Sequence, residues 1–207
     1  MKEKKNSFFP YPQLEVQSIK DKKVLAAIRR LPRKLFVDRE YHERAYDDSP
    51  LPIDCGQTIS QPFIVAYMTE KLKLQGTDRV LEIGTGSGFQ TAVLAQLVSE
   101  VYTVEIYPEL SQKAQKLLGK LGYKNVKYQV GDGKLGWNNY APFDKIIITA
   151  VALEIPFLLV EQLKIGGKMI LPLESRPSEQ YLVLITKKKT GRIEQKILIP
   201  VRFVPLK

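Results

Sequence analysis

Short apolar segments alternate with helix-like segments from Arg79 onward, and this alternation restricts the fold more than any other feature of the sequence. The apolar segments have the length and composition of strands and lie at 79–83, 101–104, 126–130, 145–149 and 168–173. Helical patterns separate several of them, at 89–97, 110–121 and 155–163. Such alternation predicts an α/β fold: a Rossmann-like, doubly wound, mostly parallel sheet with helices on both faces.

Both ends of the chain depart from this pattern. An apolar stripe at helical spacing precedes Pro32, the proline- and glycine-containing stretch 46–58 is typical of a loop, and a helix is expected to begin near Pro62. At the other end, 181–186 and 193–204 are predicted to form antiparallel strands joined by a lysine-rich turn. We therefore expect an N-terminal helical extension and an antiparallel C-terminal end to the sheet.

A glycine-rich loop follows the first strand and precedes a helix. Gly84, Gly86 and Gly88 allow the backbone to approach a ligand closely and leave the N–H groups of the helix N-terminus available. Phe89 stands where a dinucleotide-binding loop would carry its third glycine, and no Gly-Lys-Ser/Thr follows as in a phosphate-binding loop. The loop therefore indicates a different ligand, or tight turn packing alone.

Two acidic residues follow the next two strands. Glu105 ends the second strand, and Asp132, between two glycines, follows the third. Either acid alone is typical of a cap or a turn. Because the carboxyl ends of parallel strands share one edge of the sheet, the pair favours a cofactor with a nucleoside but no pyrophosphate, in which Glu105 bonds the ribose hydroxyls.

The strand and loop from Val80 to Gly88 resemble the first motif of class I S-adenosylmethionine-dependent methyltransferases. The resemblance implies that Glu105 holds the ribose of S-adenosyl-L-methionine and Asp132 its adenine end. It also implies that the glycine loop holds the methionine part and that S-adenosyl-L-homocysteine is the product.

The segment before the glycine loop resembles a narrower family. Its sequence is Gly56-Gln57-Thr58-Ile59-Ser60-Gln61-Pro62, similar to the signature of protein-L-isoaspartate (D-aspartate) O-methyltransferases, and the likeness extends from about Ile19 to the closing strand. It implies methyl transfer to the free carboxylate of L-isoaspartyl residues in damaged proteins, with D-aspartyl residues an open question. The ester then cyclises to a succinimide.

The same resemblance assigns the site residues. Ser60 corresponds to the active-site residue, although a serine just before Pro62 is also typical of a helix N-cap. The expected cofactor contacts are Gln57, Thr58, Ile59, Gly84, Gly86, Ser87, Gly88, Glu105, Ile106, Asp132 and Gly133. Asp54 and Cys55 depart from the family pattern, in which a glycine and a polar or aromatic residue are common, and Phe63 stands where His or Tyr is frequent.

The expected chemistry needs few special residues. A carboxylate is already ionised at neutral pH, so no strong general base is required, and alignment of the reacting groups can supply much of the rate. The single histidine, His42, makes no convincing Ser-His-Asp arrangement, and one His with one Cys does not predict a zinc site. We expect no metal.

The net charge of +10 raises nucleic acid as an alternative partner. Residues 1–50 carry a net +4 and 164–207 a net +7, whereas 51–163 carry −1. After the fourth strand, 149–152 read Thr-Ala-Val-Ala rather than the Asn/Asp-Pro-Pro-Tyr/Phe of amino-methylating nucleic-acid enzymes. A nucleic-acid methyltransferase and a non-catalytic cofactor-binding relative remain the alternatives, and no nucleic-acid partner is expected.

The remaining expectations concern organisation and location. One cysteine cannot form an internal disulfide, and no apolar stretch is long enough for a membrane span, so we expect a cytoplasmic protein, monomeric by default. We expect one methyltransferase domain over 1–207. Its parts are a helical and active-site segment at 1–75, a cofactor-binding core at 76–175 and C-terminal antiparallel strands at 176–207.

Overall fold

The computed structural model describes Tyr11, Leu14 and residues 19–207. The rest of the expected N-terminal segment, 1–10, 12–13 and 15–18, lies outside the described residues. In the described part, no helix has the length and apolar character needed to cross a bilayer.

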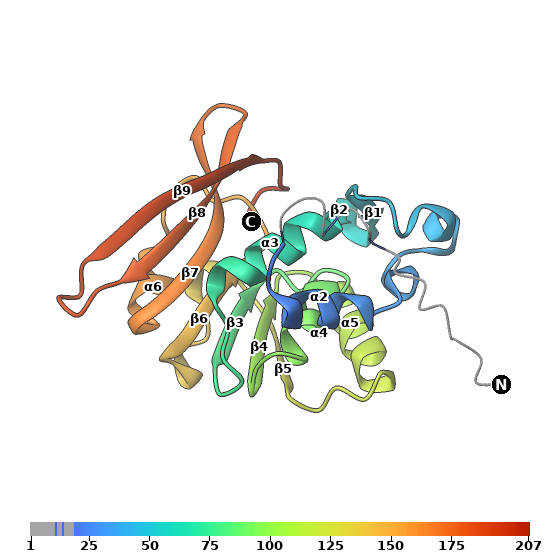
Figure 1. The fold of residues 1–207 in the computed structure, drawn as a ribbon, viewed down its shortest axis with the longest axis horizontal. Coiled ribbons are helices and arrows are strands. Elements are labelled where there is room, and N and C mark those ends of the chain that lie inside the picture. Colours follow the sequence, from blue (N-terminus) through green and yellow to red (C-terminus); the bar gives the residue numbers. More distant parts are fainter. Residues whose placement is uncertain (1–10, 12–13, 15–18) are drawn as a thin grey trace.

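A seven-stranded sheet forms the centre of the molecule, in the order β5-β4-β3-β6-β7-β8-β9 (Figure 1). Its strands are β3 (Arg79–Ile83), β4 (Glu100–Glu105), β5 (Val126–Val130), β6 (Phe143–Ile148), β7 (Leu163–Arg176), β8 (Glu179–Lys187) and β9 (Ile193–Val201). Neighbours from β5 to β7 pair in parallel, and β8 and β9 are antiparallel. The predicted α/β class is thereby confirmed, including the antiparallel C-terminal end.

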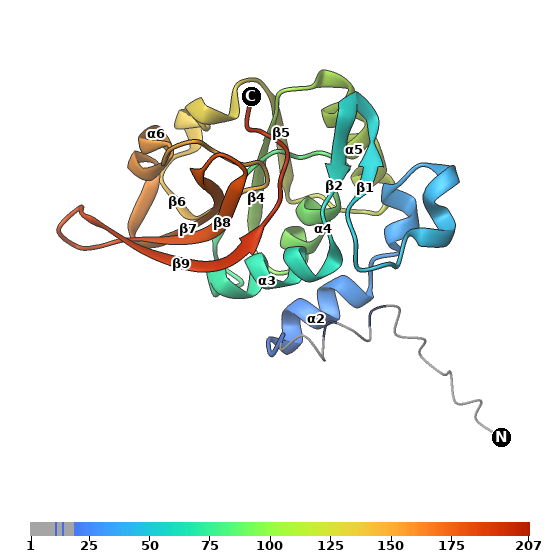
Figure 2. The ribbon, with the colours of Figure 1, turned by 90° about the horizontal axis from the view of Figure 1, so that it is seen from above.

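Helices cover both faces of this sheet (Figure 2). They are α2 (Lys22–Arg29), α3 (Pro62–Leu72), α4 (Phe89–Ala95), α5 (Pro108–Lys120) and α6 (Phe157–Glu161). Because side chains alternate along a strand, Val80 packs with α3 and α4, whereas the next residue, Leu81, packs with α6. This two-sided burial explains why β3 has a continuous apolar sequence rather than an alternating one.

Residues 19–44 pack onto the helices of one face. Asp21 caps α2, its carboxylate accepting the main-chain N–H groups of Lys23 and Val24 at 2.9 and 3.3 Å. The 3₁₀ helices η1 (Arg33–Phe36) and η2 (Arg39–Arg44) follow. Ile28 and Phe36 share one buried cluster with Phe89 of α4, so this segment joins the core rather than standing apart.

Residues 46–58 are not the continuous loop that the sequence suggested. They contain a hairpin, β1 (Leu51–Ile53) and β2 (Gln57–Ile59), joined by the 3₁₀ turn η3 (Asp54–Gly56). Strands of three residues are too short for periodicity to reveal. The turn is tight because Cys55 and Gly56 both have left-handed backbone, with φ of 58° and 65°.

Some predicted bounds also differ at the C-terminal end. Helix α6 is shorter than the predicted 155–163, since Pro156 precedes its first residue and β7 already begins at Leu163. β9 ends at Val201, and the chain then crosses the sheet edge, where Pro205 forms a parallel bridge with Val151. The C-terminal residues are thereby brought beside the strand ends that carry the predicted site.

Candidate cofactor site and active site

The carboxyl ends of β3, β4 and β5 bring the predicted cofactor residues to one edge. Ile83 pairs with Val104, and Glu105 pairs with Val130, so the glycine loop, Glu105 and the Asp132 turn follow neighbouring strands at the same level. A cavity lies at this edge. Its lining includes the predicted residues Gln57, Thr58, Gly84, Gly86, Glu105, Ile106 and Gly133, together with Thr149 and residues 204–207.

Glu105 connects its strand to the glycine loop. One carboxylate oxygen accepts the main-chain N–H of Gly86 at 2.8 Å, and the other accepts that of Tyr107 at 3.1 Å. The side chain is only 6% exposed. Because an ionised carboxylate offers about four acceptor positions, Glu105 can still accept hydrogen bonds from a pair of hydroxyl groups in the cavity.

Gly84 has no space for a side chain. Its φ is +92°, and a Cβ atom would lie 2.4 Å from Oγ1 of Thr149, whose hydroxyl donates to the Gly84 carbonyl at 2.7 Å. Gly86, at φ +52°, would meet only Ile53, at 3.6 Å. The loop is therefore held tightly on the sheet side and open on the cavity side, which fits the close approach of a ligand.

Gly88 and Asp132 lie differently from the other predicted contacts. Gly88 precedes α4 and does not line this cavity. It permits the packing of α5, since a Cβ atom there would lie 3.1 Å from Cβ of Ala114. Asp132 is exposed, and its carboxylate accepts the main-chain N–H of Lys134 at 2.8 Å. Asp132 itself does not line the cavity; it stands at the rim, next to Gly133, which does.

A second cavity brings Ser60 to the same glycine loop. Its lining includes Thr58, Ile59, Ser60, Gly84, Gly86, Ser87 and Thr149, of which Thr58, Gly84, Gly86 and Thr149 also line the first cavity. The two cavities are thus adjacent, with Glu105 in one and Ser60 in the other. No Asp, Glu, His, Lys or Arg side chain lines the second cavity within the described part of the chain.

Ser60 is not the cap of α3. Gln61 occupies the N-cap position and makes no capping bond with its own side chain. Asp48 caps the helix instead, accepting the main-chain N–H of Phe63 at 2.9 Å and the side-chain amide of Gln61 at 2.9 Å. The alternative interpretation of Ser60 as an N-cap is therefore wrong, and its hydroxyl has no capping bond to give up.

A fully buried guanidinium fixes the main chain around Ser60. Arg33 donates to the carbonyl oxygens of Ala45, Asp47, Ser49 and Ser60 at 2.8, 3.3, 3.0 and 3.0 Å. Burial lowers the pKa of Arg33 to about 10, which leaves it charged at neutral pH. The sequence does not mark Arg33 as a site residue, because it lies in a charged stretch that is typical of a surface.

A buried acid is connected to the glycine loop by hydrogen bonds. Glu82, in the middle of β3, accepts hydrogen bonds from the hydroxyls of Thr91 and Thr103 at 2.6 and 2.7 Å. Thr103 in turn shares a hydrogen bond of 2.6 Å with Thr85 of the loop. Burial raises the pKa of Glu82 to about 8. An acid within an apolar strand was the available signal, although it says nothing of the partners.

Comparison with known proteins identifies this arrangement. The family model described as protein-L-isoaspartate (D-aspartate) O-methyltransferase matches residues 8–207. The chain belongs to this family. Family membership confirms the prediction that the chain is a methyltransferase, and it disfavours the nucleic-acid alternative.

Relatives in the family match most of this chain. The protein-L-isoaspartate O-methyltransferase of Dictyoglomus turgidum is 54% identical over 194 residues, covering 94% of this chain and 87% of the relative. That of Myxococcus xanthus is 52% identical, covering 93% and 92%.

Solved structures agree with the fold. A protein-L-isoaspartate O-methyltransferase superposes with a TM-score of 0.85 at 30% identity, over 93% of this chain and 63% of the longer solved one. A beta-aspartate methyltransferase from Plasmodium falciparum, crystallised with S-adenosyl-L-homocysteine, has a TM-score of 0.83 at 27% identity, covering 94% and 95%.

Proposed function

We propose that this enzyme transfers a methyl group from S-adenosyl-L-methionine to the free carboxylate of L-isoaspartyl residues in damaged proteins. The methyl ester then cyclises to a succinimide, whose hydrolysis returns some normal aspartate. The observation that carries this proposal is the pair of adjacent cavities, in which the Gln57–Ser60 segment, the glycine loop and Glu105 meet. Membership of the family supports the choice of substrate.

The first cavity has the groups that a nucleoside-bearing methyl donor requires. Glu105 would accept hydrogen bonds from the ribose hydroxyls, and Ile106 and Gly133, with Asp132 at the rim, would border the adenine. Gly84, Gly86 and Ser87, with Gln57, Thr58 and Ile59 opposite, would hold the methionine part, while Gly88 acts through packing of the loop. When bound, S-adenosyl-L-methionine supplies a methyl group on a sulfonium.

The second cavity suits a nucleophile that needs no deprotonation. Its lining consists of hydroxyl, amide and apolar groups, and a carboxylate is already ionised at neutral pH. The Ser60 hydroxyl would donate a hydrogen bond to the acceptor carboxylate and so direct one oxygen toward the donor methyl. Arg33 holds the Ser60 carbonyl and thereby keeps the hydroxyl beside the glycine loop.

The organisation of the chain supports one catalytic unit. The buried cluster that contains Ile28 and Phe36 also contains Phe89 and Leu118, so the N-terminal segment and the cofactor core share a hydrophobic core. We extend the proposal to a single domain over 1–207 that acts as a monomer in the cytoplasm. Its partners are damaged proteins rather than nucleic acid.

The products of repair can be detected directly, and this tests the proposed function. An isoaspartyl peptide incubated with the enzyme and S-adenosyl-L-methionine, then separated by chromatography, should yield methyl ester, then succinimide, then a fraction of the aspartyl peptide. A sample without the methyl donor is the control. If no ester or aspartyl peptide forms while the protein binds S-adenosyl-L-homocysteine, the proposed substrate is wrong and only the cofactor assignment stands.

A further inference from the structure

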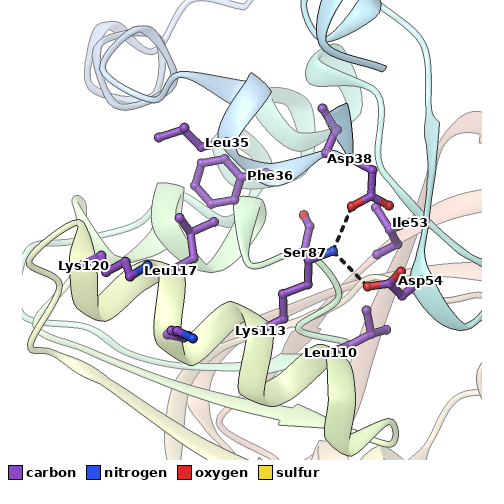
Figure 3. Close-up of a pocket in the computed structure, with 12 residues that line it drawn as sticks. Leu35, Phe36, Asp38, Ile53, Asp54, Ser87, Leu110, Lys113, Leu117 and Lys120 are labelled. Carbon is purple, nitrogen blue, oxygen red and sulfur yellow. Dashed lines mark hydrogen bonds and ion pairs between the residues drawn. The ribbon is translucent and has the colours of Figure 1, made fainter. Parts of the chain in front are cut away.

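A lysine of α5 joins two other parts of the chain beside the cofactor site (Figure 3). Nζ of Lys113 lies 2.9 Å from Oδ1 of Asp38, which precedes η2, and 2.9 Å from Oδ2 of Asp54, in the turn of the β1–β2 hairpin. These contacts span 75 and 59 positions of the sequence. One cation therefore connects three elements that are far apart along the chain.

The hairpin is not part of the central sheet: Leu51 and Ile59 of its strands are buried in the core, and the Lys113 ion pair adds a link from its turn to α5. Among the described residues, β1 and β2 pair with each other alone, in a separate two-stranded sheet. Directly after the turn, Gln57 and Thr58 line the cofactor cavity. Directly before it, Cδ1 of Ile53 lies 3.6 Å from the place that a Cβ atom on Gly86 would occupy. A shift of the Asp54 turn would therefore move residues on both sides of the site.

The ion pairs border an apolar cavity next to the glycine loop, and their three side chains are half-exposed. Its lining includes Leu35, Phe36, Ile53, Leu117 and Ser87, with Lys113 between the two carboxylates (Figure 3). The hydrogen bonds to Asp54 and Asp38 raise the pKa of Lys113, so it stays a cation at neutral pH. Without that cation, two carboxylates would face each other and repel across the gap.

We propose that Lys113 is a positioning residue for the cofactor: by clamping Asp54 and Asp38 to α5, it holds the β1–β2 hairpin so that Gln57 and Thr58 face the glycine loop. This inference rests on the proposed function, because it takes the cavity of Glu105 as the cofactor site. It also gives a role to Asp54, through which the turn of the hairpin is joined to α5.

Titration calorimetry with S-adenosyl-L-homocysteine tests the clamp. Lys113→Met should raise the dissociation constant about fivefold, because it removes both ion pairs and leaves two facing carboxylates. Lys116→Met is the matched control: Lys116 lies on the same helix and lines the same cavity, and the described residues give it no ion pair. Its dissociation constant should match the wild type.

A second variant separates positioning from general loosening of the fold. Asp54→Asn should weaken binding by about twofold, and the double variant with Lys113→Met should bind no more weakly than Lys113→Met alone, since both remove the same contact. In turnover assays the KM for S-adenosyl-L-methionine should rise while kcat at saturation is unchanged. Equal affinities for Lys113→Met and Lys116→Met, or additive losses in the double variant, would overturn the clamp. A wild-type protein that does not bind S-adenosyl-L-homocysteine would instead overturn the proposed function.

Discussion

The guanidinium of Arg33 donates a hydrogen bond to the main-chain carbonyl oxygen of Ser60 across 3.0 Å. Three further carbonyls, of Ala45, Asp47 and Ser49, accept from the same group, which has no exposed surface. The planar guanidinium can reach four acceptors at once, whereas a lysine ammonium cannot. The position of the proposed catalytic serine therefore depends on one buried charge contributed by η1.

Replacing Arg33 by lysine should lower both stability and turnover. A lysine cannot donate to all four carbonyl groups, whose contacts with Arg33 are buried for Ala45 and partly buried for the others. The free energy of unfolding should therefore fall by about 2 kcal/mol or more. The kcat should fall as well, because Ser60 is less well placed. Urea denaturation and steady-state kinetics check the two effects, with Arg30→Lys at an exposed position as the control. Wild-type kcat in the Arg33→Lys variant would show that this contact does not position Ser60.

Replacing Ser60 by alanine should affect catalysis and leave folding unchanged. The hydroxyl does not cap α3, so the free energy of unfolding should stay within about 0.5 kcal/mol of wild type. Turnover with an isoaspartyl peptide should fall about tenfold or more, because a hydrogen bond to the acceptor carboxylate is lost. Affinity for S-adenosyl-L-homocysteine should be retained. An unchanged kcat would remove Ser60 from the catalytic machinery.

The capping assignment has its own test at Asp48. Because this carboxylate accepts the main-chain N–H of Phe63, Asp48→Ala should lower the free energy of unfolding by ~1 kcal/mol. Urea denaturation beside the Ser60→Ala variant makes the comparison direct. A larger loss for the serine variant than for the aspartate variant would contradict the assignment.

Glu105→Gln should weaken cofactor binding selectively. The carboxamide keeps one acceptor but turns an NH₂ group toward either Gly86 N–H or Tyr107 N–H, which are donors themselves. Loss of hydrogen bonds to a charged acceptor should raise the dissociation constant of S-adenosyl-L-homocysteine about tenfold or more. Titration calorimetry measures it, with Asp132→Asn, at the exposed rim, expected to have the smaller effect. Equal affinities in wild type and Glu105→Gln would place the ribose elsewhere.

Glu82 should make the stability of the fold fall as pH rises. Burial raises its pKa from 4.5 to about 8, so above 4.5 the unfolded chain loses a proton that the native protein keeps. The free energy of unfolding should therefore decrease from about pH 4.5 to about pH 8 and then level off. Glu82→Gln removes this contribution. The free energy of unfolding of Glu82→Gln minus that of wild type should therefore increase by at least ~1 kcal/mol from pH 4.5 to about pH 8, as measured by urea denaturation. A constant difference would contradict the raised pKa.

The sequence predicts the sheet well for a physical reason. Strands that are buried on both faces, such as β3, are largely apolar along their length, and the helices between them repeat their apolar residues at helical spacing. Both patterns are therefore visible in the sequence alone. The place of Glu105 at the carboxyl edge follows from that topology. The Gly56–Pro62 motif predicts membership of the family, because its residues are contiguous and can be recognised in the sequence alone.

The features of the site that the sequence does not predict depend on contacts between residues that are far apart along the chain. The Lys113 contacts with Asp38 and Asp54 depend on tertiary packing, and no local pattern marks them. Arg33 is satisfied by main-chain carbonyls, which every residue has, so its partners leave no trace in the sequence. The β1–β2 hairpin is not predicted from the sequence because each of its strands has three residues, too few to show an alternating pattern.

Methyl transfer to a matched pair of peptides tests the central claim most directly. The two peptides have the same sequence and differ only in whether one aspartate is joined through its side-chain or its main-chain carboxyl group. With labelled S-adenosyl-L-methionine, we expect label on the isoaspartyl peptide alone, released by mild base as an ester should be. Equal labelling of both peptides, or label on neither while S-adenosyl-L-homocysteine binds, would contradict the account.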